Sequence, residues 1–535
     1  MPPVSRSVRA SIVGFLFLLT LSACAVRLVG LEHLLVWHDE VFTLVRVFGY
    51  SQSEIRQAIF SGELLTADQL LRFQTPDPSL GWSDAFRAFI GHPEHAPLYY
   101  VLGKLTTLLP FSPLVSLRGL SAVFGILLIP ATYWLMRELF GRGLIPWVSA
   151  TLIACSPLQY LYAQEARQYA LWTLLVVASS AALQRALHRN GVADWWVYGI
   201  LVALGLYAHL LFALMIPVHA LYVYLTERFD RERLISHAGR WAIATTAALV
   251  AFVPWLVVVL TKVELVGHYT EWMTAPRGLD EIATSWGQHL IRMFLDLNPE
   301  KISGGWVLLL PIVWALAHFI RRAPRPVAWM LILIAVAQVA TVLVPDLLLG
   351  GSRSLHVRYA LPGVLALQLM VAWVIASAMQ EKEAKTRLIG RSALVLSVAL
   401  GVSSLVAIQR SNTWWNKNLS AHNGEVARIV NAGDRPLVVA SDLGMSSGEL
   451  ISLAYLLDDR ARIWGAPDEQ ATNLPTGYGE MVALTPWFEL RPHMEKDYEL
   501  VAVAGTWQWF KVIPRASPEF VIPSATTTSE GGESQ

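Results

Sequence analysis

Charged residues are scarce in this 535-residue sequence: Asp, Glu, Lys and Arg together make up 15% of it, whereas soluble domains contain roughly 25%. Cysteine is scarcer still, since only Cys24 and Cys155 occur and each lies inside an apolar stretch. The low charge excludes a chain that is surrounded by water along its whole length. The two isolated cysteines give no support for a disulfide or a thiolate metal site.

Apolar residues are abundant instead: 54% of the sequence is hydrophobic, and apolar stretches recur from residue 11 to residue 408. A helix that crosses a bilayer needs about 20 such residues. We therefore predict an all-α polytopic membrane protein with about eleven transmembrane helices. These are expected near residues 11–31, 118–137, 144–162, 168–187, 195–208, 210–225, 241–261, 305–320, 327–345, 358–379 and 391–408.

The basic residues predict the orientation of these helices. With the N-terminus in the cytoplasm, every cytoplasmic loop carries a basic cluster, as the positive-inside rule requires. These clusters lie at residues 137–142, 185–189, 228–240, 321–325 and 382–391. Counting residues 97–112 as a further span would invert every later span and place these clusters outside. We therefore predict that 97–112 form a juxtamembrane or re-entrant helix on the outer face of the inner or plasma membrane.

The first apolar stretch allows two interpretations. It contains Leu21-Ser22-Ala23-Cys24 after a basic start, which is similar to a lipoprotein cleavage site. However, the apolar residues continue through Leu31, farther than in an ordinary signal peptide. We expect a retained signal anchor, with cleavage as the alternative.

Charge also separates the C-terminal part from the rest. Residues 411–535 carry a net charge of −7 and the remainder carries +8. A basic membrane part with an acidic tail indicates two compartments and not nucleic-acid binding. We predict a transmembrane domain over 1–410, a small extracytoplasmic α/β domain over 411–523 with strands near 437–440, 500–503 and 509–512, and a disordered tail over 524–535.

The transmembrane domain has two long outer loops, 32–117 and 262–304. In the second, apolar residues from Leu279 to Leu297 recur on one helical face. The preferred interpretation is a helix that lies in the membrane interface. The alternative is a lid over a site.

The first outer loop opens with Trp37-His38-Asp39-Glu40, directly after the first span. Two adjacent carboxylates beside lipid are costly, which indicates a general base at the depth of a lipid headgroup. Glycosyl transfer needs such a base, together with cations that stabilise a phosphate leaving group. On the same side lie the segments 92–100 and 164–169 and the pair Arg358-Tyr359. Each alone is explained by residues that anchor span ends, but together they indicate a site.

These segments resemble the GT-C superfamily of membrane glycosyltransferases, in particular family 39, which includes protein mannosyltransferases and aminoarabinose transferases. The resemblance covers roughly residues 20–365. Its motifs are Arg27-Leu28 through Trp37-His38-Asp39-Glu40, His95-Ala96-Pro97-Leu98-Tyr99-Tyr100, Ser116-Leu117-Arg118-Gly119-Leu120-Ser121, Ser156-Pro157 through Gln164-Glu165-Ala166-Arg167, Leu206-Tyr207-Ala208-His209 and Arg358-Tyr359-Ala360-Leu361-Pro362.

The resemblance implies a mannosyltransferase-like enzyme of the cell envelope that uses a polyprenyl-phosphate-linked sugar and inverts the anomeric carbon. The implied site residues are Asp39 as the base, with Glu40 and Glu165, as catalytic; His95, Arg167 and Arg358 for the donor phosphate; and His38, Tyr99, Tyr169 and Tyr359 as substrate-lining. The acceptor is a lipid, a glycan or a protein. No cofactor or metal ligand cluster is evident beyond the carboxylates, and because metal use differs among relatives a divalent cation stays an option.

The sequence differs from some relatives at two places that are expected to lie near the donor phosphate. They place an Arg or Lys close behind the Asp-Glu pair or before the Pro of the juxtamembrane helix. Here Val41-Phe42-Thr43 follow the pair, and His95-Ala96 precede Pro97. Two other functions are kept as alternatives: a ligase or polymerase of lipid-linked oligosaccharides, and a flippase or transporter of a lipid-linked sugar.

Overall fold

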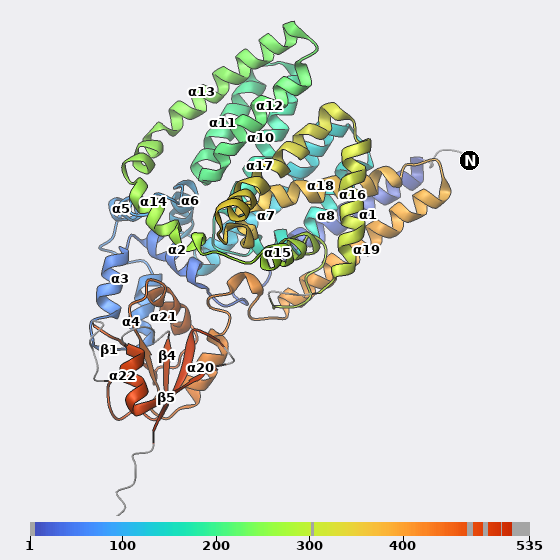
Figure 1. The fold of residues 1–535 in the computed structure, drawn as a ribbon. Helices are drawn as coiled ribbons and strands as arrows, with labels where there is room; N and C mark the ends of the chain where they lie inside the picture. Colours follow the sequence, from blue (N-terminus) through green and yellow to red (C-terminus); the bar gives the residue numbers. More distant parts are fainter. Residues whose placement is uncertain (1–5, 301–303, 468–473, 485–489, 504–505, 516–535) are drawn as a thin grey trace, which may run out of the picture. The chain divides into compact units, whose positions relative to one another are not determined.

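The computed structural model describes residues 6–300, 304–467, 474–484, 490–503 and 506–515 (Figure 1). The chain divides into two compact units. The first, here called the membrane unit, consists of residues 1–55 and 71–421, and the second, the sheet unit, consists of 56–70 and 422–535. The tail over 524–535, predicted to be disordered, lies outside the described residues.

The membrane unit is built from long apolar helices. Among the described residues, seven helices are long and apolar enough to cross a membrane, and a pair bent by 59° makes an eighth if it is one span. The seven are α7 (Pro113–Phe140), α10 (Tyr169–Arg189), η2 with α12 (Leu210–Glu227), α13 (Arg231–Thr261), α17 (Arg325–Leu349), η6 with α18 (Val357–Ala378) and α19 (Ala384–Gln409), and the bent pair is α8 (Leu144–Ala154) with α9 (Pro157–Ala163). These helices confirm the all-α, multi-pass class.

The number of such helices is smaller than the eleven expected, because three predicted spans correspond to shorter helices. These are α1 (Arg6–Val26), whose apolar part is Ser11–Val26, α11 (Val192–Ala208) and α16 (Leu309–Arg322). At about 1.5 Å per residue, the 14 residues of α16 extend about 21 Å. This is less than the roughly 30 Å of a bilayer core.

Between α1 and α7 the chain forms short helices. They are α2 (His38–Phe48), α3 (Gln52–Ile59), α4 (Ala67–Leu71), η1 (Arg72–Gln74), α5 (Trp82–Ile90) and α6 (Leu98–Thr106). With nine residues, α6 is too short to span a bilayer. It packs against α2 and α7, with Lys104 Nζ donating to the carbonyl of Val47 at 3.1 Å.

The second predicted outer loop also forms short helices: α14 (Val263–Thr270), η3 (Glu271–Thr274), α15 (Leu279–Ile291) and η4 (Trp306–Leu308). The predicted amphipathic helix is α15, which ends at Ile291 and so is shorter than the apolar pattern. Its first apolar residue, Leu279, is exposed, whereas His289 is buried and bonded to the carbonyl of Ser354 at 3.2 Å. The buried face of α15 is therefore mixed, since it combines Ile282 and Ile291 with Ser285, Gln288 and His289.

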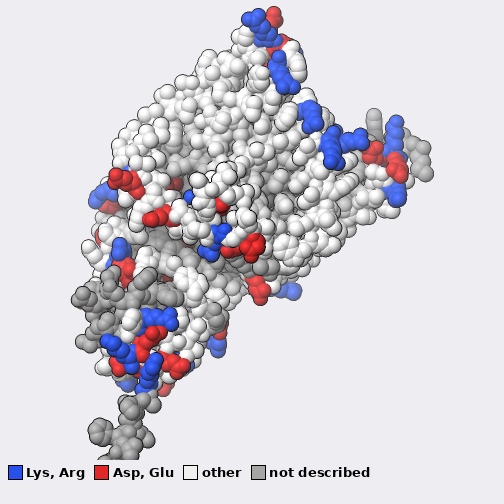
Figure 2. All heavy atoms as spheres, in the orientation of Figure 1, with Lys and Arg blue, Asp and Glu red and all other residues white. Residues whose placement is uncertain are grey.

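Charge on the surface follows the ends of the helices. Figure 2 shows Lys and Arg side chains at the turn between α12 and α13, along the upper right edge and at the turn between α18 and α19, while the broad helix surface below that edge is almost all white. This pattern is typical of helices that pass through lipid.

The sheet unit contains one six-stranded sheet with the order β1-β3-β2-β4-β6-β5. The strands are β1 (Leu64–Leu65), β2 (Leu437–Ala440), β3 (Arg462–Gly465), β4 (Met481–Leu484), β5 (Tyr498–Ala502) and β6 (Trp509–Pro514), and the helices are α20 (Asn423–Ala432), α21 (Ser446–Ala454) and α22 (Leu490–Asp497). β2 is parallel to β3 and β4, and the other pairs are antiparallel. The C-terminal α/β prediction is therefore confirmed.

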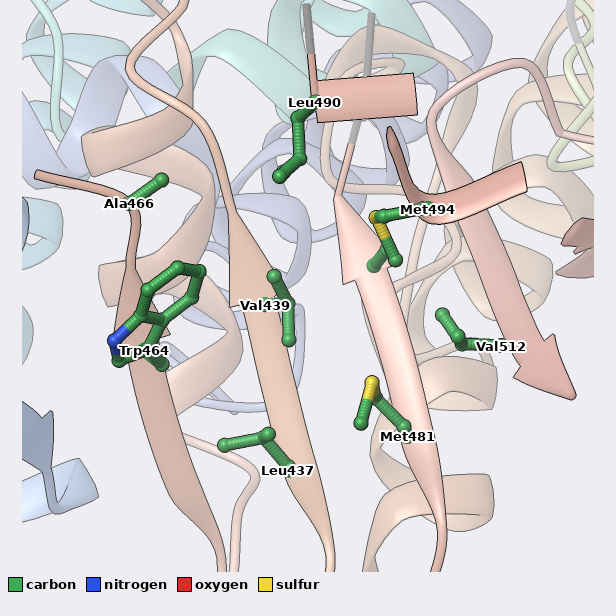
Figure 3. Packing of buried hydrophobic residues seen from close by; sticks show 9 residues of the cluster. Leu437, Val439, Trp464, Ala466, Met481, Leu490, Met494 and Val512 are labelled. Carbon is green, nitrogen blue, oxygen red and sulfur yellow. The ribbon is translucent and has the colours of Figure 1, made fainter. Parts of the chain in front are cut away.

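All residues of β2 and β4 are buried, as expected for central parallel strands that are covered on both faces. On one face, Leu437, Val439 and Met481 pack against Leu490 and Met494 of α22 (Figure 3). The sequence did not predict β1. It comes from residues of the first long loop and pairs Leu64 with Trp464.

A glycine sets the distance between α7 and α9. A Cβ at Gly125 would lie 2.4 Å from the Cβ of Ala163, whereas a Cβ at Gly239 in α13 would meet nothing within 4 Å. We expect Gly125→Ala to lower the free energy of unfolding by about 1–3 kcal/mol, because the helices must move apart. Gly239→Ala is the control and should be neutral or slightly stabilising. Thermal unfolding of the purified protein in detergent measures both, and equal melting temperatures would contradict this packing.

Candidate active site

The site begins at the N-terminus of α2. Asp39 and Glu40 occupy its first turn, where the helix dipole favours negative charge. Successive side chains on a helix point about 100° apart. The two carboxylates therefore face different surroundings, although they are neighbours in the sequence.

Glu40 is fully buried in a cluster of cationic and backbone donors. Arg118 of α7 donates from Nε to Oε1 (2.8 Å) and from Nη2 to Oε2 (2.6 Å). Lys417 Nζ donates to Oε2 at 2.9 Å, and the backbone N–H of Ala166 donates to Oε1 at 2.9 Å. Burial alone would raise the pKa of Glu40, but Arg118 and Lys417 outweigh it and lower the pKa to about 2. Both oxygens are thus occupied, which gives Glu40 a positioning role.

Arg118 extends this cluster to the backbone. Its Nη1 donates to the carbonyls of Leu31 (2.7 Å) and Leu34 (2.8 Å), and its Nη2 also donates to the carbonyl of Leu35 (3.1 Å). Arg118 therefore holds the connection between α1 and α2 against α7. It belongs to a motif that the sequence singled out, but it was not expected in the site.

Asp39 faces two arginines. Its Oδ2 lies 3.4 Å from Arg358 Nη1 and 3.8 Å from Arg167 Nη2, and 19% of its side chain is exposed. Burial alone would raise the pKa of Asp39, but the two guanidinium groups outweigh it and hold the pKa below its ordinary value. Asp39 is therefore a carboxylate at neutral pH with access to solvent.

The two arginines are held by weak polar contacts and aromatic rings. Arg167 Nη1 lies 3.4 Å from the Thr43 hydroxyl and 3.4 Å from the Tyr100 hydroxyl. The guanidinium of Arg358 lies 5.4 Å from the Trp37 ring and 5.2 Å from the Tyr359 ring. Cation–π contacts leave the N–H groups available for a ligand.

Glu165 approaches from the turn between α9 and α10. Its Oε2 accepts from Asn416 Nδ2 at 2.9 Å, while Oε1 is buried with no hydrogen-bond partner among the described residues. Burial raises the pKa of Glu165 to about 7, although Lys417 opposes the shift. Near neutral pH this carboxyl can therefore donate or accept a proton.

The other residues that the sequence predicted for the site lie around Asp39, Arg167 and Arg358. His95 reaches it through Gln168, whose Nε2 lies 3.3 Å from His95 Nδ1. The rings of Tyr169 and Tyr359 pack edge to face at 6.4 Å. His38 is partly exposed, and its backbone N–H donates to the Ser420 hydroxyl at 3.1 Å.

Tyr99 differs from these residues because it is fully buried and its hydroxyl is directed at α7. It donates to the carbonyl of Leu117 at 3.1 Å and lies 2.7 Å from the Ser121 hydroxyl. The structure therefore places Tyr99 in the packing between α6 and α7.

The segment after the last long helix supplies residues that the sequence did not predict. Besides Asn416 and Lys417, Trp414 Nε1 and Trp415 Nε1 donate to Asp296 Oδ2 at 2.9 and 2.7 Å. Two tryptophans and a lysine at a span end are typical of a membrane interface. Their sequence therefore gave no signal for a site.

Within the described ranges, no group of three or more His, Cys, Asp or Glu side chains is placed to hold a metal ion.

Comparison with known proteins finds a partial family match and structures of similar fold. Residues 94–258 match the family model described as "Dolichyl-phosphate-mannose-protein mannosyltransferase". The structure of ArnT from Cupriavidus metallidurans bound to undecaprenyl phosphate covers 93% of this chain, and this chain covers 98% of it, with a TM-score of 0.55 at 13% identity. Its apo state has a TM-score of 0.54 at 13% identity and covers 94% and 98%. The chain has the GT-C fold. No curated protein sequence matches it.

The GT-C resemblance predicted from the sequence motifs is thereby confirmed. A third similar structure is the apo oligosaccharyltransferase of Archaeoglobus fulgidus, with a TM-score of 0.47 at 13% identity, covering 95% of this chain and 75% of that one. The matched family segment contains His95, Glu165 and Arg167, whereas Asp39 and Arg358 lie outside it.

The Glu40 cluster predicts an effect of substitution on the stability of this protein. Glu40→Gln leaves Arg118 and Lys417 buried without their shared carboxylate, so we expect a loss of about 3–5 kcal/mol in the free energy of unfolding. The measurement is the yield and melting temperature of the purified variant. Asp39→Asn is the matched neighbour: its ion pairs are longer, at 3.4 and 3.8 Å, and its side chain is partly exposed, so it should lose less than Glu40→Gln. A Glu40→Gln protein of wild-type stability would contradict the positioning role.

The raised pKa of Glu165 predicts a pH-dependent difference. The folded protein binds this proton up to about pH 7, whereas an unfolded Glu releases it near pH 4.3, so wild-type stability falls as the pH rises between these values. Glu165→Gln removes the ionisation and should become more stable relative to wild type from pH 5 to pH 8, by on the order of 3 kcal/mol.

Melting temperatures of Glu165→Gln and wild type across this pH range test the expectation. Glu232→Gln, at an exposed position in the first turn of α13, serves as the control and should show no such trend. A difference between Glu165→Gln and wild type that does not change with pH would count against a buried neutral Glu165.

Proposed function

We propose that this protein is a membrane glycosyltransferase that moves a sugar from a polyprenyl-phosphate-linked donor to an acceptor hydroxyl. The observation that carries the proposal is the ionised, partly exposed Asp39 carboxylate between Arg167 and Arg358. A base with two fixed cations, each within 4 Å of it, is what a hydroxyl attack with a phosphate leaving group requires. The lipid phosphate in the name of the ArnT structure and in the description of the family supports this donor class.

In the proposed reaction, Asp39 accepts the proton of the acceptor hydroxyl as its oxygen attacks the anomeric carbon. The bond between that carbon and the phosphate oxygen breaks, and its electron pair stays on the phosphate. Arg167 and Arg358 stabilise the charge that develops there, because their buried N–H groups are already oriented. A single displacement of this kind inverts the anomeric carbon.

Glu165 and Glu40 have different parts in this proposal. Glu165 faces the acceptor side, where its free Oε1 can bond a hydroxyl of the sugar or the acceptor. Glu40 holds α2 in place through Arg118 and Lys417 and does not touch the reacting atoms.

We place the reaction on the non-cytoplasmic face of the inner or plasma membrane. The support is the distribution of basic loops, which puts the N-terminus in the cytoplasm and the C-terminal domain outside. The acceptor is a lipid, a glycan or a protein, and the oligosaccharide ligase or polymerase function remains within the same scheme. A transporter would place its ionisable groups on broken helices at mid-membrane, whereas Asp39 lies on α2, outside the candidate spans.

The central test is Asp39→Asn. Loss of the proton acceptor should lower the transfer rate by about 10²–10⁴-fold, with membrane insertion intact and a smaller loss of melting temperature than in Glu40→Gln. Transfer is measured in proteoliposomes with polyprenyl-phosphate sugars and candidate acceptors. Asp280→Asn, at an exposed aspartate of α15, is the control and should keep full activity. Full activity of Asp39→Asn would refute the mechanism, and sugar movement across the membrane without a new glycosidic bond would favour a transporter.

A further inference from the structure

Arg46 is a buried cation for which the described residues supply no hydrogen bond to Nε or Nη1. It lies in the last turn of α2 with 7% of its surface exposed. Its Nε and Nη1 atoms are buried and make no hydrogen bond within the described part of the chain. The contacts of its guanidinium are the rings of Phe42 (6.0 Å) and Tyr100 (5.9 Å). A buried charge without a carboxylate is costly, so this position calls for an anion that comes from outside the chain.

Arg46 lies on the same face of α2 as Asp39. Seven residues separate them, which is two helical turns and about 10 Å along the axis. Between them, Thr43 contacts Arg167. The hydroxyl of Tyr100 also lies 3.4 Å from Arg167, while its ring contacts Arg46. Arg46 therefore continues the row of cations that begins beside Asp39.

His92 and His95, the histidines near Arg46, do not supply positive charge for a phosphate. Burial, followed by the nearby charges of Arg46 and Arg167, holds the pKa of His95 well below its ordinary value, and burial and Arg46 also lower the pKa of His92. Both rings are occupied as well: His92 Nδ1 lies 3.1 Å from Glu94 Oε1, and His95 Nε2 lies 3.5 Å from the same atom. At neutral pH the fixed positive charge beside these histidines comes from Arg46.

We propose that Arg46 is a third phosphate-binding cation, which holds the phosphate of the lipid carrier after the sugar has left. This proposal rests on the proposed function and adds that the site prefers the released lipid phosphomonoester to the donor phosphodiester. The donor phosphodiester carries one negative charge, whereas the released phosphomonoester carries about 1.5 to 2 at pH 7. When the bond to the anomeric carbon breaks, the electron pair stays on the phosphate oxygen. Arg46 supplies a countercharge for that second charge, in place of the Lys or Arg that the sequence lacks before Pro97.

The test measures binding of undecaprenyl phosphate to the purified full-length protein. We expect Arg46→Gln to bind it about 10- to 100-fold more weakly, the loss of a charge-assisted hydrogen bond. In the transfer assay, kcat should fall more than the KM for the donor rises. Arg46→Lys should restore part of the affinity. Arg87→Gln is the matched control, since that arginine is 76% exposed and paired with Asp84 at the surface.

Melting temperatures separate binding from folding. Because Nε and Nη1 of Arg46 make no hydrogen bond to the described residues, Arg46→Met and Arg46→Gln should melt at or above the wild-type temperature without ligand, whereas a purely structural arginine would give a loss. If Arg46→Gln does not fold, Arg46→Met and Arg46→Lys carry the comparison, and destabilisation of all three would overturn the proposal.

The ligand comparisons separate the remaining outcomes. Wild type that does not bind undecaprenyl phosphate would refute the proposed function itself. Wild type that binds it, with Arg46→Gln binding equally well, would overturn only the role of Arg46. Inorganic phosphate that competes as strongly as undecaprenyl phosphate would show a site for free phosphate and would overturn the assignment to the lipid carrier.

Discussion

The geometry of the site depends on one buried carboxylate, Glu40. It joins four parts of the chain: its own helix α2, Arg118 on α7, the backbone N–H at Ala166 and Lys417 after α19. Two cations on one carboxylate leave a net positive charge in the protein interior. In the proposed function, the phosphate of the lipid donor offsets part of that charge, so the cluster that holds the fold together would also favour an anion in the site.

Asp39 and Glu40 show how one step along a helix separates two functions. Neighbouring residues on a helix are rotated by about 100° about its axis. The Glu40 side chain therefore points at donors that occupy both its oxygens, whereas the Asp39 side chain stays partly exposed between Arg167 and Arg358. A base needs a free lone pair and access to the acceptor, whereas a positioning residue needs neither. The adjacent carboxylates of the sequence are therefore not two equivalent candidates.

Much of the fold could be predicted from the sequence because lipid restricts a chain strongly. Every backbone group inside a bilayer must be bonded within a helix, so a long apolar run such as 241–261 has a single solution. Spans were harder to predict from shorter apolar runs. For example, α16 was expected to be a span, but its 14 residues fall below the spanning length. In the acidic tail, the strands β2 and β6 followed from their apolar runs, while the two-residue β1 depends on pairing with β3 and had no local signal.

For the site, the sequence by itself determined the residue types and their clustering at the ends of apolar runs: Asp39, Glu165, Arg167 and Arg358 were all predicted, and the structure brings them together. Only the tertiary structure decided which carboxylate is partly exposed and which is enclosed by donors, that the rings of His92 and His95 lie beside Glu94, and that Lys417 lies against Glu40. The reason is physical. A charge placed beside lipid is visible in the sequence because it is costly there, but whether that charge is balanced by a partner depends on contacts between residues hundreds of positions apart, such as Glu40 and Lys417.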